Sequence, residues 1–197
     1  MQTTDIAKLP FRLRAIVDSE LQPGEQIIWL DQPIAKRMAW ATFPLVLFGI
    51  PWTAFALFWT GMAGLGTSKA SGGLFSFFPF FGLPFILIGF GMLSSPYWAA
   101  RRARNSAYLL TDRRALLFNA GFRGNISVRS FEPERLTDLT RNQRSDGSGD
   151  IIFGNDRWRD SDGDTRTQSV GFLGIANVKE VEELIRALAR KSARPPS

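Results

Sequence analysis

Charged residues are nearly absent from one long stretch of the chain. Residues 38–100 contain a single charged residue, Lys69, whereas the other 41 Asp, Glu, Lys and Arg residues lie in the two flanking segments. Within the stretch, 38–60 and 77–98 are uncharged runs of 23 and 22 residues. As helices they would reach roughly 33 to 34 Å, enough for a hydrocarbon core of roughly 30 Å. The pattern predicts a transmembrane hairpin with a Gly- and Ser-rich turn.

The alternative is a buried hairpin in a soluble protein, but a soluble core helix rarely continues beyond two turns without a polar face. Neither run contains Asp, Glu, Lys, Arg or His, so transport by this chain alone is not expected. Pro44, Pro51 and Pro84 fall inside the runs and predict bent helices. Small residues recur every seven positions and either line a close helix contact or reflect ordinary membrane-helix composition: Thr42, Gly49 and Ala56, then Gly82 and Gly89.

Basic residues flank the predicted hairpin on its two open ends. Lys36 and Arg37 precede it and Arg101, Arg102 and Arg104 follow it, while the connecting turn carries one lysine. By the positive-inside rule, both termini are expected to be cytoplasmic.

Aromatic residues are expected to anchor the hairpin at the membrane interfaces. Trp40 and Trp59 lie near the two ends of the first run, and Tyr97 and Trp98 lie at the end of the second.

The segment before the hairpin predicts two short elements. Residues 9–21 form an amphipathic pattern with Leu9, Leu13 and Val17 on one helical face. Residues 26–30 (QIIWL) follow a Pro-Gly turn and read as an added strand. The helix either docks on a soluble domain or lies on the membrane.

The segment after the hairpin has a strand-rich pattern. Apolar runs and turn residues predict a hairpin over 106–111 and 114–119, and further strands near 126–131, 136–139, 150–153 and 167–172. An apolar stripe and a capping-box pattern at Asn177 and Glu180 then predict a C-terminal helix. The expected fold is α+β: a transmembrane hairpin followed by a small β-barrel or sandwich of about seven strands with a C-terminal capping helix.

The expected domain organisation follows from these patterns. Residues 1–37 form an N-terminal helix and strand, 38–100 the hairpin, 101–191 the β-rich domain, and 192–197 a disordered tail.

The composition removes most catalytic chemistry. The chain has no cysteine and no histidine, so thiolate nucleophiles, imidazole bases and the usual zinc ligands are missing. Asp160, Asp162 and Asp164 alternate as calcium ligands do, but the glycine and glutamate that an EF-hand needs are absent, which favours a polar loop. The glycine-rich segment 146–150 lacks a lysine and favours a turn. No catalytic, cofactor-binding or metal-binding residue is predicted, and the chain is not expected to be an enzyme.

Two motifs carry a family resemblance. Residues 108–116 (YLLTDRRAL) resemble the opening hairpin of bacterial pleckstrin-homology-like (PH-like) domains, in which such a pattern follows a pair of membrane spans. Residues 21–25 (LQPGE) with Trp29 resemble the segment that precedes the spans in those membrane-anchored proteins. The resemblance implies a seven-stranded, partly open barrel capped by a helix, and a role in binding, scaffolding or self-association in the bacterial inner membrane.

The expected function is therefore noncatalytic: a cytoplasmic PH-like domain, held at the bilayer, that binds a protein partner or another copy of itself. The alternative is recognition of anionic lipid headgroups, with five candidate contacts: Arg101, Arg102, Arg104, Arg113 and Arg114. Arg113 and Arg114 can equally be solvated turn residues. An enzyme with an unrecognised site is the third hypothesis, and nucleic acid is not an expected partner because the 18 basic residues of 101–197 are interspersed with 13 acidic ones.

Overall fold

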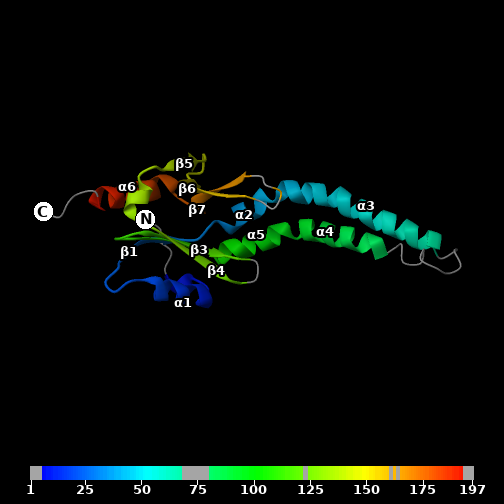
Figure 1. Cartoon of the computed structure of the whole chain (residues 1–197), viewed down its shortest axis with the longest axis horizontal. Helices are drawn as coiled ribbons and strands as arrows, with labels where there is room; N and C mark the ends of the chain where they lie inside the picture. Colours follow the sequence, from blue (N-terminus) through cyan, green and yellow to red (C-terminus); the bar gives the residue numbers. More distant parts are fainter. Residues whose placement is uncertain (1–5, 68–79, 122–123, 160–161, 163–164, 193–197) are drawn as a thin grey trace. The chain divides into compact units, whose positions relative to one another are not determined.

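The structure, a computed structural model, describes residues 6–67, 80–121, 124–159, 162 and 165–192 (Figure 1). The chain divides into two compact units, one made of residues 1–37 together with 101–197 and the other of residues 38–100. The helices in the described part are α1 (Phe11–Glu20), α2 (Ala35–Ala41), α3 (Phe43–Thr67), α4 (Leu83–Leu93), α5 (Ser95–Arg104) and α6 (Val178–Ser192). The strands there are β1 (Ile27–Asp31), β2 (Ala107–Thr111), β3 (Ala115–Ala120), β4 (Ile126–Phe131), β5 (Thr140–Gln143), β6 (Gly149–Arg159) and β7 (Thr165–Ile175).

One helix of the apolar unit has the length and composition of a membrane span. The segment Phe43–Gly66, within α3, is long and apolar enough to cross a membrane without help from a neighbouring helix, and its residues are mostly exposed. The predicted second span, 77–98, is not one straight helix: α4 and α5 meet at a 47° bend, and the pair is long enough only if both helices count as one span. Residues 77–79 lie outside the described part. The described residues thus contain one helix long and apolar enough to cross a membrane, and the bent pair is either a broken span or a re-entrant loop.

The helices are interrupted twice, each time two residues before a proline: at Thr42 between α2 and α3, before Pro44, and at Ser94 between α4 and α5, before Pro96. Pro44 and Pro84 each lie in the first turn of a helix, where the missing amide proton is not needed. Only Pro51 of the three is inside a helix. Pro96, which was not among the three, is the second residue of α5 and cannot donate to the carbonyl of Met92; the hydroxyl of Ser95 donates to that oxygen at 2.7 Å.

Small residues bring α3 and α4 close together. A Cβ atom at Gly49 would lie 2.9 Å from the Cβ of Met92, and Cβ atoms at Gly82 and Gly89 would overlap the hydroxyls of Thr60 and Thr53. These glycines confirm the predicted contact seam. Their threonine partners were not anticipated from the sequence.

The other unit contains two antiparallel sheets. The first has the order β1-β2-β3-β4 and the second the order β5-β6-β7. Leu30 of β1 pairs with Leu109 of β2. Two strands that precede and follow the apolar unit in the sequence are therefore neighbours in the sheet. The α+β class is confirmed, but the sheets do not close into a barrel: among the described residues, no strand of one sheet pairs with the other.

One predicted strand is misplaced. Residues 136–139 do not form a strand: a 3-10 helix, η3, covers Pro133–Leu136, with its proline in the first turn, and β5 begins only at Thr140. The proline fixes φ near −65° and lacks an amide proton, which suits the start of a helical turn better than a strand interior.

The first sheet separates two apolar clusters because its side chains alternate between faces. On one face, Leu30, Leu109 and Phe118 pack with Leu13 and other residues of α1. On the opposite face, a second cluster of buried residues includes Trp29, Tyr108, Leu110, Phe172 and Ile185. Figure 1 shows α1 on one side of this sheet, and α6 with the second sheet on the other. The predicted amphipathic helix therefore docks its apolar face on the sheet.

Candidate functional site

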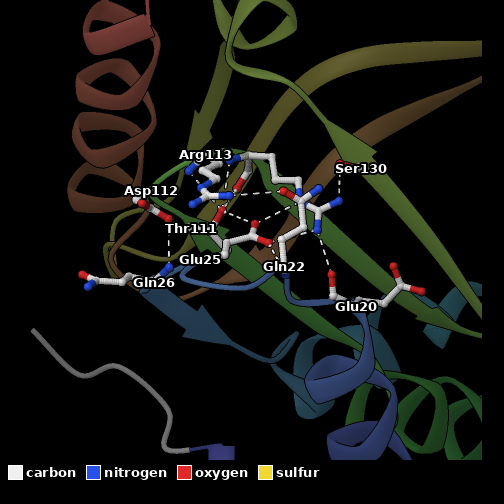
Figure 2. Close-up of polar contacts among 9 residues, drawn as sticks. Glu20, Gln22, Glu25, Gln26, Thr111, Asp112, Arg113 and Ser130 are labelled. Atoms are coloured by element: carbon white, nitrogen blue, oxygen red, sulfur yellow. Dashed lines mark hydrogen bonds and ion pairs between the residues drawn. The ribbon is translucent and has the colours of Figure 1, made fainter.

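Two turns that are distant in the sequence meet at one end of the first sheet (Figure 2). One turn precedes β1, where Gly24 has a φ of 78°, a value that favours glycine. The other joins β2 to β3 through Asp112 and Arg113. Asp112 ties them together, because its carboxylate accepts the amide proton of Gln26 at 2.9 Å and its own amide donates to the Gln26 carbonyl at 3.0 Å.

A buried ion pair lies between these turns. The side chain of Glu25 has 0% of its surface exposed, and that of Arg114 has 13%. Arg114 donates from Nε to one carboxylate oxygen at 2.9 Å and from Nη2 to the other at 3.0 Å. This is the bidentate geometry that suits a guanidinium and a carboxylate.

Two further donors complete the coordination of the Glu25 carboxylate. The hydroxyl of Thr111 lies 2.8 Å from Oε1, and the amide of Gln22 lies 2.8 Å from Oε2. The hydrogen bond from Arg114 is the largest cause that lowers the pKa of Glu25 to about 2, and the bonds from Gln22 and Thr111 act in the same direction. The carboxylate is therefore charged and fully occupied by groups of the chain.

Arg114 is held from a second side as well. Its Nη2 donates to the carbonyl of Glu20, the last residue of α1, at 2.7 Å. The amides of Arg113 and Arg114 both donate to the hydroxyl oxygen of Thr111, at 3.2 and 3.0 Å. The cluster thus joins α1, β1 and the β2–β3 turn, and we call these residues, Glu25, Thr111 and Arg114, the buried polar cluster.

The motifs behind the family resemblance contain this cluster. Glu25 ends the LQPGE motif and Thr111 and Arg114 belong to the YLLTDRRAL motif, so the structure brings the two motifs into contact. The sequence singled out both motifs but not the ion pair between them. Their opposite charges were the available signal, and a separation of 89 residues hid the contact.

A second set of contacts joins the places where the chain leaves and re-enters this unit. The side-chain amide of Gln32, after β1, donates to the carbonyls of Arg104 and Ser106, before β2, at 2.8 and 3.1 Å. The Ser106 hydroxyl donates to the carbonyl of Arg102 at 2.9 Å and accepts the amide proton of Ala120 at 3.0 Å.

The five arginines proposed for headgroup contact fall into two groups at opposite ends of β2. Arg101, Arg102 and Arg104 are exposed in the last turn of α5, just before β2 begins. Arg113 and Arg114 follow the end of β2. Arg113 is exposed and lies 3.4 Å from the Gln22 side chain, whereas Arg114 belongs to the buried polar cluster. The five do not form one surface.

The four predicted interface aromatics lie in helices. Trp40, in α2, and Tyr97, in α5, are exposed, and the rings of Tyr97 and Trp98 lie 5.4 Å apart. Trp59 is exposed within α3, which continues to Thr67, beyond the predicted end at residue 60.

The acidic loop motifs are only partly covered by the described residues. Asp162 of the alternating acidic loop is exposed, and Asp160 and Asp164 lie outside the described residues. The carboxylate of Asp146 accepts hydrogen bonds from the amide of Ser148, at 3.0 Å, and from its hydroxyl, which lowers the pKa of Asp146. This is a self-contained turn. In the described part of the chain, no three His, Cys, Asp or Glu side chains are grouped to hold a metal ion.

The chain matches no protein-family model, no curated protein and no solved structure.

Proposed function

We propose that this chain is a noncatalytic membrane protein of the bacterial inner membrane. In this proposal, α3 and the bent pair α4 and α5 form the anchor. The unit built from both flanking segments is a PH-like module that binds a protein partner or a second copy of the chain. The pairing of β1 with β2 carries the proposal, because it ties the module to both ends of the apolar unit.

Two features support this assignment. The two sheets and the terminal helix α6 provide a compact module with a core of its own. The carboxylate of Glu25, whose pKa is strongly lowered, accepts four hydrogen bonds from groups of the module, which fits a structural role better than proton transfer.

Crosslinking in intact membranes tests the proposed binding role. Lys179 and Lys191, on α6, are exposed and accessible to an amine-reactive crosslinker. We expect a discrete crosslinked species that is reduced when both are changed to arginine, which keeps the charge and removes two of the exposed amines. A strictly monomeric chain that recovers no partner in membranes, by crosslinking or by purification in mild detergent, would count against the proposal.

Topology has its own test. Both termini are proposed to be cytoplasmic, so tags at the two ends should resist external protease in intact cells. Digestion of either tag would overturn the orientation.

Recognition of anionic headgroups is the second candidate. It is favoured by the exposed Arg101, Arg102 and Arg104, which stand where the apolar unit ends. Changing all three to glutamine should reduce retention of anionic lipid by the purified full-length chain, whereas Arg190→Gln with Lys191→Gln, at the end of α6, should not. Equal retention by the two variants would remove this candidate.

A further inference from the structure

The outer face of α1 has a charge pattern that helix stability does not explain. Lys8, Arg12 and Arg14 lie at or before the first turns of the helix, and the acidic residues Asp18 and Glu20 lie in its last turn. Cations are unfavourable near a helix N-terminus and anions near a C-terminus, because both oppose the helix dipole. The pattern is the reverse of the stabilising one.

An apolar side chain stands among these cations. Phe11 is 85% exposed. It lies opposite Leu13 and Val17, the residues that dock the helix on the first sheet. Arg12 and Arg14, one and three residues after it, are also exposed. Arg14 has only a marginal contact with Asp18, at 4.0 Å.

The start of α1 lies at the end of the first sheet where β1 ends and β2 begins. The chain reverses between α1 and β1, so the start of α1 lies near the end of β1 and the beginning of β2 (Figure 1). Leu9, just before α1, belongs to the same cluster as Ala107, the first residue of β2. At this end the chain departs for the apolar unit at residue 37 and returns from it at residue 101.

More cations gather where the chain leaves and returns. Exposed basic side chains stand there on both connecting segments: Lys36, Arg101, Arg102 and Arg104. The acidic Asp31, at the end of β1, is half-buried, and its carboxylate accepts the amide proton of Gln32. This end of the module therefore carries more exposed basic than acidic side chains among the residues named, and the exposed Phe11 lies on the helix that begins there.

We propose that the start of α1 docks on an anionic bilayer surface, with Phe11 inserted at the headgroup level and Lys8 and Arg12 against lipid phosphates. The inference rests on the proposed membrane anchoring, which brings this end of the module to the bilayer. Charge complementarity selects the occupant: anionic headgroups attract the cations, and an interface accommodates an aromatic ring flanked by basic residues.

Spin labelling of the full chain tests this contact, since the protein has no cysteine of its own. Ala15→Cys places a nitroxide on the exposed side of α1, one turn after Phe11. Ala187→Cys places the same label at an exposed alanine of α6 as a matched control. Collision rates with oxygen and with a water-soluble nickel chelate are compared in nanodiscs of phosphatidylcholine with and without phosphatidylglycerol.

We expect the oxygen-to-nickel ratio at the α1 label to rise above that of the α6 label in the anionic discs, and to fall when salt is added. Phe11→Ser, or Lys8→Gln with Arg12→Gln, should return the ratio to the α6 value while the far-ultraviolet circular dichroism stays unchanged. Equal ratios at the two labels in anionic discs would overturn the inference. So would a high ratio that survives both sets of substitutions.

Resistance of the same labelled chain to carbonate extraction separates the two proposals. Extraction of the chain by carbonate would show that it is not anchored in the membrane and would overturn both proposals. A chain that stays in the membrane with a water-exposed α1 label overturns the α1 contact alone. Shielding of the label that appears only when a second protein is added would also overturn it, because it would identify a protein surface.

Discussion

Arg114 donates two hydrogen bonds to the carboxylate of Glu25. The two residues are 89 positions apart in the sequence, and the apolar unit lies between them in the chain. The Glu25 side chain is completely buried, and β1 and β2 begin and end beside this pair. The pair therefore holds together the two segments from which one module is built.

Arg114→Met tests how much the module depends on this contact. The substitution leaves the Glu25 carboxylate buried without its cation, and we expect a loss of about 3 kcal/mol in the stability of the β1–β2 pairing. Hydrogen exchange of the β1 and β2 amides in the full chain in detergent measures it. Arg113→Met, at the exposed neighbour, is the matched control and should cost at most about 0.5 kcal/mol. Equal effects of the two substitutions would contradict the structural role of the pair.

Acid should weaken the same contact in a defined pH range. The Arg114 hydrogen bond lowers the pKa of Glu25 from its ordinary value of 4.5 to about 2. A carboxylate with a depressed pKa stabilises the fold fully above the ordinary value, and the contribution is lost as the pH falls through the folded-state pKa. The stability difference between the native chain and Glu25→Gln should therefore be largest above pH 4.5 and shrink towards pH 2. A difference that does not change with pH would contradict this account.

Tyr108 should lose its proton at a higher pH than an exposed tyrosine. Burial of its ring is the main cause that raises the pKa of its hydroxyl to about 12. The chain has two tyrosines, so Tyr97→Phe leaves Tyr108 as the sole source of tyrosinate absorbance. An ultraviolet titration should give a midpoint near 12 for the folded chain and near 10 in denaturant. A midpoint near 10 before unfolding would show that the ring is exposed to water.

Phe172 is expected to be the most sensitive core position of the module. Its ring centroid lies 5.2 Å from each of those of Trp29, Tyr108 and Phe153, so it joins both sheets. Phe172→Ala should destabilise the module by about 3 to 5 kcal/mol. Phe11→Ala removes the same atoms from an exposed site and should cost at most about 0.5 kcal/mol in thermal unfolding. A similar cost at both positions would refute the assigned packing.

The glycine seam between α3 and α4 gives a matched pair of variants. Gly89→Ala places a methyl group against Thr53, and the helices must separate to admit it. We expect a loss of about 1 to 3 kcal/mol in thermal unfolding in detergent. Gly91→Ala makes the same chemical change two residues away and should be nearly neutral, because the added Cβ would have no heavy atom within 4 Å beyond its own helix backbone and chain neighbours. Comparable losses would show that helix propensity or lipid exposure, rather than the seam, decides the outcome.

The sequence predicted the elements whose pattern is local. The apolar stripe of α6, including Val178, Val181 and Ile185, is buried as expected, and the β2–β3 hairpin matches its predicted limits within one residue. Periodicity records which side of a single element is buried, so such elements can be predicted without knowledge of their neighbours.

What depends on distant residues could not be predicted in this way. No local signal shows that Trp29 lies against Phe172, or that Glu25 meets Arg114, because each contact is made by segments far apart in the chain. The break before Pro96 was missed for a different reason: Pro51, Pro84 and Pro96 look alike in the sequence. The sequence does not show where one helix ends and the next begins, and the 47° bend lies at such a junction, before Pro96.

The pairing of β1 with β2 also sets the order in which the protein can be made. β1 leaves the ribosome before the apolar unit, but its partner strand begins only at Ala107. Before β2 and β3 are synthesised, Glu25 lacks its partner Arg114, and the apolar face of α1 lacks most of the sheet on which it packs. The module therefore cannot be completed before the apolar unit has been synthesised.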